Sequence, residues 1–143
     1  MGRTNWKLVF LGGLLAGIIM NFLGFLALAI YLRKLWNPAL EALNPAFKET
    51  IGFQAFWAVF YLISGILAVW LYSAIRPRYG SGPQTAFRAA FMFWVLSGLS
   101  FAVGLGSFGL FPVSLLAIDT LTYLAMVIVA TLAGACIYQE PFP

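Results

Sequence analysis

The sequence predicts an all-α integral membrane protein, a bundle of four transmembrane helices. Hydrophobic residues make up 63% of the 143 residues and charged residues 8%, and the mean hydropathy is +0.96. Soluble domains are nearer ~45–50% apolar and ~25% charged, so soluble enzymes, disordered tails and disulfide-rich secreted domains are excluded. The apolar residues gather in four runs of at least about the 20 residues that a membrane-spanning helix needs. Eleven of the twelve charged residues lie outside these runs.

The four runs form a single transmembrane domain over residues 1–143. Charged residues bound most of them, but no charge separates the last two. We place that break at 109–112, where glycine loosens the end of one helix and proline suits the first turn of the next. The predicted spans are 8–32, 51–75, 89–111 and 112–138.

The segment 33–50 between the first two spans predicts a short helical segment lying at the membrane interface. It contains two Asn-Pro-Ala triplets that begin at Asn37 and Asn44. The triplets look like the aquaporin signature, but they lie seven residues apart in one loop, so we interpret both asparagines as helix N-caps. Apolar residues recur there at helical spacing: Leu40, Leu43 and Phe47.

The distribution of basic residues predicts the orientation, because cytoplasmic segments of membrane proteins are enriched in Lys and Arg. The N-terminal segment and the loop after the second span carry Arg3, Lys7, Arg76, Arg78 and Arg88, against three basic residues in the loop after the first span. We therefore expect both termini in the cytoplasm and a multi-pass protein of the cell inner membrane. For Arg76, Arg78 and Arg88 we expect anionic lipid headgroups, not nucleic acid, as the partner.

The side-chain inventory excludes several kinds of chemistry. The chain has no histidine, and Cys136 is its only cysteine, which excludes histidine-ligated haem, most zinc sites, thiolate clusters and intrachain disulfides. The four acidic residues are too dispersed for a carboxylate metal site. The residues 104–109 match Gly-x-Gly-x-x-Gly, but at the end of an apolar span, without the preceding strand of a dinucleotide-binding unit. We expect no enzymatic activity, no metal and no cofactor.

Asp119 is the only charged residue inside a predicted span. At ~1.5 Å per residue it lies about 10 Å from the nearer membrane surface, where a carboxylate needs a partner, water or a proton. The polar side chains at this depth either form hydrogen bonds that fix helix register, or they form a site for a proton, ion or small molecule. Asn21 is one expected partner of Asp119, and Arg33 and Lys34 are others. Polar side chains at similar depth predict a layer: Asp119, Asn21, Ser100, Thr122, Ser64 and Tyr123.

Small residues recur along one face of three spans, which is typical of close helix packing. One four-helix bundle need not use all of these faces, so they also predict self-association or packing against a larger membrane complex. The residues are Gly13, Gly17 and Gly24 in the first span, Gly98, Ala102 and Gly106 in the third, and Ala130 and Ala133 in the fourth.

The residues 70–86, from Trp-Leu-Tyr-Ser to Gln-Thr-Ala, resemble a run in small uncharacterised bacterial four-helix membrane proteins. The Gly-Gly-Leu-Leu-Ala-Gly opening of the first span and the Ala-Thr-Leu-Ala-Gly-Ala ending of the fourth are similar too. The resemblance implies an inner-membrane protein of about this size. It implies no activity and assigns no functional residue.

Two functions follow as hypotheses. The first is a non-enzymatic interaction, accessory or self-assembling subunit that packs through its small-residue faces. The second is a small, dimeric ion or small-molecule transporter or channel that uses the polar layer, with Asp119 and Asn21 at its centre. A membrane enzyme that acts on lipids is the weakest hypothesis, because no histidine, acidic cluster or activated nucleophile is present.

Overall fold

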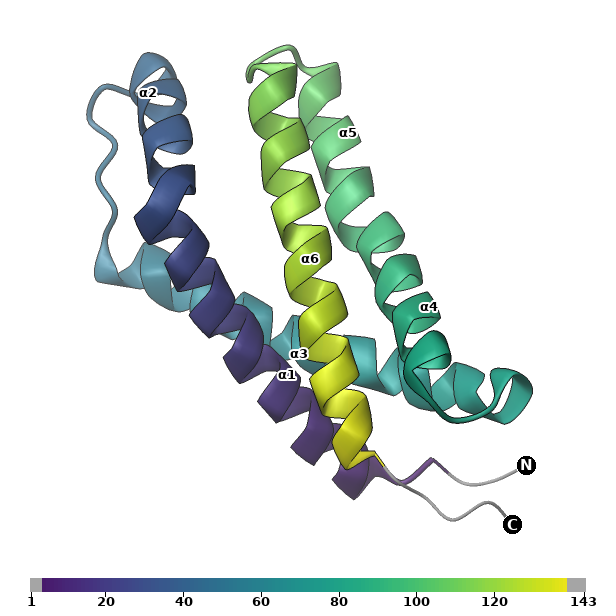
Figure 1. Cartoon of the computed structure of the whole chain (residues 1–143). Helices are drawn as coiled ribbons and strands as arrows, with labels where there is room; N and C mark the ends of the chain where they lie inside the picture. Colours follow the sequence, from purple (N-terminus) through teal and green to yellow (C-terminus); the bar gives the residue numbers. More distant parts are fainter. Residues whose placement is uncertain (1–3, 139–143) are drawn as a thin grey trace.

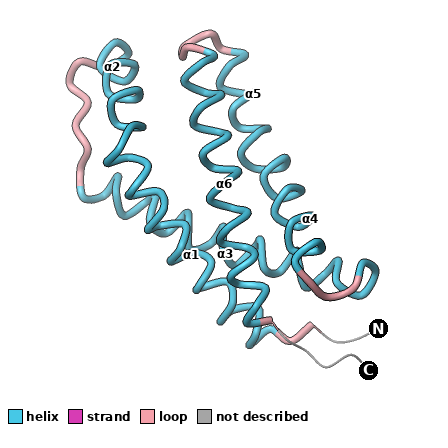
Figure 2. Tube along the Cα trace, viewed as in Figure 1, coloured by secondary structure: helices cyan, strands magenta, loops and turns pink. Residues whose placement is uncertain are grey.

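The computed structural model describes residues 4–138, which form four long helical rods (Figures 1 and 2). Each rod is long and apolar enough to cross a membrane, so the chain is an all-helical, multi-pass membrane protein. Arg3, which entered the orientation prediction, lies outside the described residues. The first rod consists of α1 (Trp6–Ala27), the π-helical η1 (Leu28–Leu32) and α2 (Arg33–Leu43), and the second is α3 (Ile51–Tyr79). The third rod consists of α4 (Pro83–Trp94), the π-helical η2 (Val95–Leu99) and α5 (Ser100–Ser107), and the fourth is α6 (Val113–Ile137).

The first rod continues past the predicted span 8–32, because α2 follows α1 and η1 without a break. Asn37 lies inside α2, and Asn44 ends it, so the expectation that these asparagines start new helices is wrong. Pro38 lacks the N–H that would bond to a carbonyl of the preceding turn. Because α2 has no buried residue, the carbonyl left without this bond lies outside the buried core. The Oδ1 atom of Asn44 instead accepts a hydrogen bond from the N–H of Ala46 at 3.1 Å.

Glycine and proline mark the other helix ends. The helix α3 runs past residue 75, the predicted end of the second span, and ends before Gly80. Gly80 has a φ of +83°, a backbone conformation that residues other than glycine rarely adopt. Gly82, with φ +135°, precedes α4, and Pro83 occupies the first helical position, where its missing N–H costs no hydrogen bond. Gly109, with φ +66°, lies in the turn between α5 and α6, at the predicted break 109–112.

The bundle is packed more extensively at one end than at the other. Figure 1 shows α1, α3, α4 and α6 meeting near the chain termini, while α2 leans away from α5 and α6 at the opposite end. Neither α2 nor α5 contributes a buried residue. We call the end with the termini the closed end, and the end with α2 and the α5–α6 turn the open end. The core at the closed end includes Val9, Ala16, Met20, Val69, Ala86, Ala89, Ala90, Val127 and Ala130.

Glycines allow three of the helices to approach closely at the closed end. A Cβ atom on Gly13 would lie 2.5 Å from a Cα atom of α3, and a Cβ atom on Gly65 would overlap the backbone of Gly17. A Cβ atom on Gly12 would lie 2.5 Å from the carbonyl oxygen of Gly134 in α6. The small-residue face of the first span therefore packs α1 against α3 and α6 within one chain.

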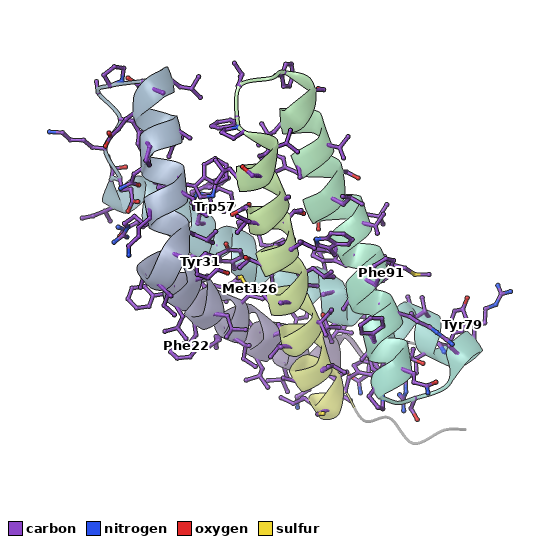
Figure 3. All side chains as sticks on the ribbon, turned by 45° about the horizontal axis from the view of Figure 1, so that its top comes forward. Phe22, Tyr31, Trp57, Tyr79, Phe91 and Met126 are labelled. Atoms are coloured by element: carbon purple, nitrogen blue, oxygen red, sulfur yellow. The ribbon has the colours of Figure 1, made fainter. Side chains whose placement is uncertain are left out.

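Large apolar side chains cover the outside of the rods. Phe22 is 61% exposed, and Figure 3 shows it pointing away from the bundle. Ile51 is 87% exposed at the start of α3, and Leu96 and Val113 are also exposed. Monomeric soluble proteins rarely expose contiguous apolar patches of this extent, so these faces fit contact with lipid chains.

Candidate functional site

The carboxylate of Asp119 lies at the open end, where α6 faces α2. The indole N–H of Trp36 donates a hydrogen bond to Oδ1 of Asp119 at 3.0 Å. The ring of Phe111 meets the Trp36 ring edge-on, with centroids 5.3 Å apart. The side chains of Trp36 and Asp119 are both half-buried. Trp36 therefore joins α2 to α6 across the open end.

The second carboxylate oxygen of Asp119 is open. Among residues 4–138 it has no hydrogen-bond partner, and protein atoms do not cover it completely. Arg33, an expected partner, instead pairs with Glu49 at 3.3 Å, and this is the only ion pair within the described residues. Asp119 thus has one neutral donor and no cationic partner in this part of the chain, whereas carboxylates within a span are usually paired.

Hydroxyl groups lie one turn along α6 from Asp119. The hydroxyls of Tyr31 and Thr122 are 2.7 Å apart, and Thr122 donates to the carbonyl of Ile118 at 2.7 Å. Because the single hydroxyl proton of Thr122 is used in that bond, Tyr31 is the donor in the first. This bond attaches η1 to α6 beside the Trp36–Asp119 bond.

A pair of tyrosines continues the cluster toward the middle of the bundle. The rings of Tyr61 in α3 and Tyr123 in α6 stack with centroids 6.4 Å apart, and Tyr123 lies one helical turn along α6 from Asp119. The Tyr123 hydroxyl is buried near the hydroxyls of Ser64 and Ser97, but no atom of the described residues lies in hydrogen-bonding geometry with it. Ser64 itself is 3% exposed. We call Asp119, Trp36, Tyr31, Thr122, Tyr61 and Tyr123 the Asp119 cluster.

Two members of the predicted layer lie elsewhere. The Asn21 amide donates to the carbonyls of Gly17 at 3.0 Å and of Ala58 in α3 at 3.1 Å, so the contact expected with Asp119 is not formed. The physical reason is the close α1–α3 approach, which turns Asn21 toward α3. Ser100 is exposed, and its hydroxyl donates to the carbonyl of Val95 within its own rod.

Sequence reasoning missed four contributors to the site. Nothing in the sequence linked Trp36, Tyr31, Tyr61 or Ser97 to Asp119. The indole N–H of a half-buried tryptophan usually finds an acceptor, but its sequence position does not show which one. Thr120 and Thr131 are also buried, and their hydroxyls have no partner among residues 4–138.

The predicted packing residues mostly face the chain's own helices. A Cβ atom on Gly24 would lie 3.0 Å from the Tyr61 ring, and one on Gly98 would lie 2.6 Å from the Tyr123 ring. A Cβ atom on Gly106 would be in ordinary contact with a leucine of α6 at 3.5 Å. Ala130 is buried, and Ala102 and Ala133 are half-buried.

The three arginines at the closed end differ in exposure. Arg76 is 8% exposed, and its guanidinium lies 5.6 Å from the centroid of the Tyr138 ring. Arg78 and Arg88 are exposed, and the Arg88 guanidinium lies 4.9 Å from the centroid of the Tyr79 ring. Arg78 and Arg88 are therefore the arginines accessible to lipid headgroups.

A charged hollow of about 310 Å³ lies beside α2, outside the apolar runs. Two basic and two acidic side chains line the hollow, so their charges sum to zero. Within residues 4–138 no group of three acidic, cysteine or histidine side chains is placed to hold a metal ion. The hollow is lined by Arg33, Asn37, Glu41, Phe47, Lys48 and Glu49.

Comparisons of this chain with protein-family models, with curated proteins and with solved structures found no match.

Proposed function

We propose that this chain is a non-enzymatic protein of the bacterial inner membrane that acts as an accessory or self-assembling subunit. The observation that carries the proposal is the unequal packing of the bundle. Four helices bury a continuous core at the closed end, whereas α2 and α5 bury no residue at the open end. Helices in a membrane gain stability from van der Waals packing and interhelical hydrogen bonds, so a helix of a second copy or of a larger complex would complete the open end.

The surface for this association differs from the one that the sequence indicated. The glycine face of α1 is used against α3 and α6, and Gly98 packs on Tyr123. Gly104 in α5 is a small residue within a helix that stays open, because an added Cβ atom there would meet nothing within 4 Å. Association would therefore use α5 and the neighbouring open end.

The orientation with both termini in the cytoplasm belongs to this proposal. Support comes from Arg78 and Arg88, which are exposed at the closed end and suit the anionic headgroups of the cytoplasmic leaflet. We assign α2 to the opposite interface, where its exposed Leu35 and Leu43 would meet lipid and its charged residues would meet headgroups.

Photo-crosslinking tests the association. A photoreactive phenylalanine analogue at Phe101 in α5 should give an adduct with a second copy or a partner, while the same analogue at the equally exposed Phe10 in α1 should give none. Native mass spectrometry in a mild detergent would report the matching dimer or complex. Monomers alone, or equal adducts at both positions, would overturn the proposal.

A second candidate function is a small ion or small-molecule transporter or channel, which the open carboxylate oxygen of Asp119 favours. Ionisable residues inside membrane spans commonly mark transport pathways. The test is flux of protons, cations or anions into liposomes that contain the wild type or its Asp119→Asn variant. Flux that the substitution removes supports this function, and absence of flux with the wild type excludes it.

A further inference from the structure

The open oxygen of Asp119 calls for a positive charge from outside the described chain. An ionised carboxylate in an apolar span is costly unless it is paired. Trp36 supplies one neutral hydrogen bond, to Oδ1, and the second oxygen accepts none from residues 4–138. Of the two basic residues expected nearby, Arg33 is bound to Glu49, and Lys34 forms no ion pair within the described residues. The geometry thus leaves one oxygen of the carboxylate without a partner among the described residues.

The surroundings of Asp119 suit an organic cation better than a metal ion. Ca²⁺ takes six to eight oxygen ligands and Mg²⁺ about six, whereas Asp119 belongs to no group of three or more acidic, cysteine or histidine side chains in the described chain. The nearby hydroxyls of Tyr31 and Thr122 are already bonded to one another. Aromatic faces attract ammonium groups, and desolvation strengthens that attraction.

Aromatic rings from several elements lie in the region of Asp119, and Trp36 contacts its carboxylate directly. Trp36 comes from α2 and contacts Phe111, and Tyr31 comes from η1. Tyr61 comes from α3 and stacks on Tyr123, which lies one helical turn along α6 from Asp119. The Tyr61 ring also contacts the Trp57 ring, with centroids 6.2 Å apart. Figure 3 shows Tyr31 and Trp57 in the region between the first rod and α6.

We propose that Asp119, Trp36 and Tyr61 bind a lipophilic organic cation, of the class of quaternary ammonium ions, phosphonium ions and protonated alkylamines. The carboxylate provides the counter-charge, and the rings replace the water around the cation's apolar groups. Because the site lies at the open end between apolar rods, the ligand reaches it from the lipid phase. The inference concerns the same site as the transporter hypothesis but requires only binding.

Two probe ions of equal shape and opposite charge provide the first test. Titration calorimetry on the purified full chain in detergent would compare tetraphenylphosphonium with tetraphenylborate. We expect saturable binding of the cation, at least about tenfold tighter than that of the anion. Equal binding of both ions, or no saturable binding of the cation, overturns the proposal without recourse to any variant.

Three substitutions and one control variant then locate the site. Asp119→Asn keeps the side-chain shape and an oxygen for Trp36, and should weaken tetraphenylphosphonium binding at least about tenfold. Tyr61→Leu should weaken tetraphenylphosphonium binding several-fold, whereas Tyr61→Phe, which keeps the ring, should bind it as tightly as the wild type does. Glu41→Gln is the matched control, because it removes an exposed acid of α2 outside the cluster and should change nothing.

The outcomes separate this inference from the proposed functions. Binding that is lost in Asp119→Asn without any flux in liposomes keeps the inference and removes the transporter. Equal affinities of the wild type and Asp119→Asn overturn the inference, whatever the flux or crosslinking results. Equal loss in Glu41→Gln and Asp119→Asn also overturns it, because general surface charge then explains the binding.

Discussion

At the scale of single residues, satisfied polar groups contrast with the open oxygen of Asp119. Within the described residues, three buried hydroxyls also lack a partner, those of Tyr123, Thr120 and Thr131. Asn21 bonds to two carbonyls, and the hydroxyls of Tyr31 and Thr122 bond to each other. Asp119 keeps one oxygen open. Hydrogen bonds between helices in a membrane contribute little on average, about 0.6 kcal/mol. The satisfied groups therefore fix helix register, and the open carboxylate is the candidate for binding.

The Trp36–Asp119 bond leads to the first stability prediction. Trp36→Phe keeps a ring but removes the N–H donor, so we expect the free energy of unfolding to fall by about 1.5–3 kcal/mol, as for loss of a bond to a charged group. Thermal unfolding in detergent measures this. Trp57→Phe serves as the control, because the Trp57 indole makes ring contacts but no hydrogen bond to the described residues. Equal losses in the two variants would contradict the assignment.

At the scale of the elements, close backbone approach determines which helices pair. The α1–α3 contact depends on glycines of both helices, and the α1–α6 contact on Gly12 and Gly134. The third rod packs differently: its α4 part joins the core, while its α5 part reaches only the edge of α6. The same rod is thus anchored at the closed end and loosely held at the open end.

A pair of glycine substitutions tests this contrast. Gly65→Ala would place a Cβ atom on the backbone of Gly17, so the helices must separate, and we expect a loss of about 1–3 kcal/mol. Gly104→Ala meets nothing within 4 Å, and alanine favours helix by up to about 1 kcal/mol over glycine, so its stability should hold or rise. Thermal unfolding of both variants gives the answer. A Gly65→Ala protein as stable as the wild type would refute the close packing.

The arginines at the end of α3 and the start of α4 yield a prediction about lipid binding. Removing both exposed guanidinium groups with Arg78→Gln and Arg88→Gln should lower retention of anionic lipid in native mass spectrometry, at about 1 kcal/mol per residue. Retention of a neutral lipid should not change. Arg76→Gln should instead lower thermal stability, since Arg76 is buried against Tyr138. Equal anionic-lipid loss in all three variants would count against this division.

At the scale of the whole molecule, the rods form a bundle that is closed at one end and splayed at the other (Figure 1). The closed end holds the termini and the α3–α4 loop, and the open end holds the Asp119 cluster. A membrane permits this shape because lipid chains can cover apolar surface that water would expel. The splayed end is also the part of the molecule where a ligand or a partner helix can enter.

Labelling of introduced cysteines tests the proposed orientation. In a Cys136→Ser background, Ala46→Cys places a thiol in the α2–α3 loop and Ser81→Cys places one in the α3–α4 loop. A membrane-impermeant maleimide should label the first in intact spheroplasts and the second only after permeabilisation. The reverse pattern would place the termini outside the cytoplasm, and equal labelling of both would indicate mixed orientation.

Local physical chemistry already determines much of this protein. Runs of apolar residues specify four membrane-spanning helices, because the length of an apolar helix must match the bilayer. The turn residues Gly80, Gly82 and Pro83 specify the bend between α3 and α4 through their backbone preferences. The break near Gly109 follows in the same way. Asp119 stands out for a similarly local reason, as the single charge within an apolar run.

Only the tertiary structure decides which polar groups meet. Asn21 and Asp119 lie at similar predicted depth, yet the glycine contact between α1 and α3 directs Asn21 to Ala58. Trp36 reaches Asp119 because α2 continues the first rod, although the two residues are far apart in sequence. Hydropathy places a side chain along the membrane normal but says nothing of rotation about each helix axis or of helix neighbours. Those depend on packing between helices, and packing therefore determines the site.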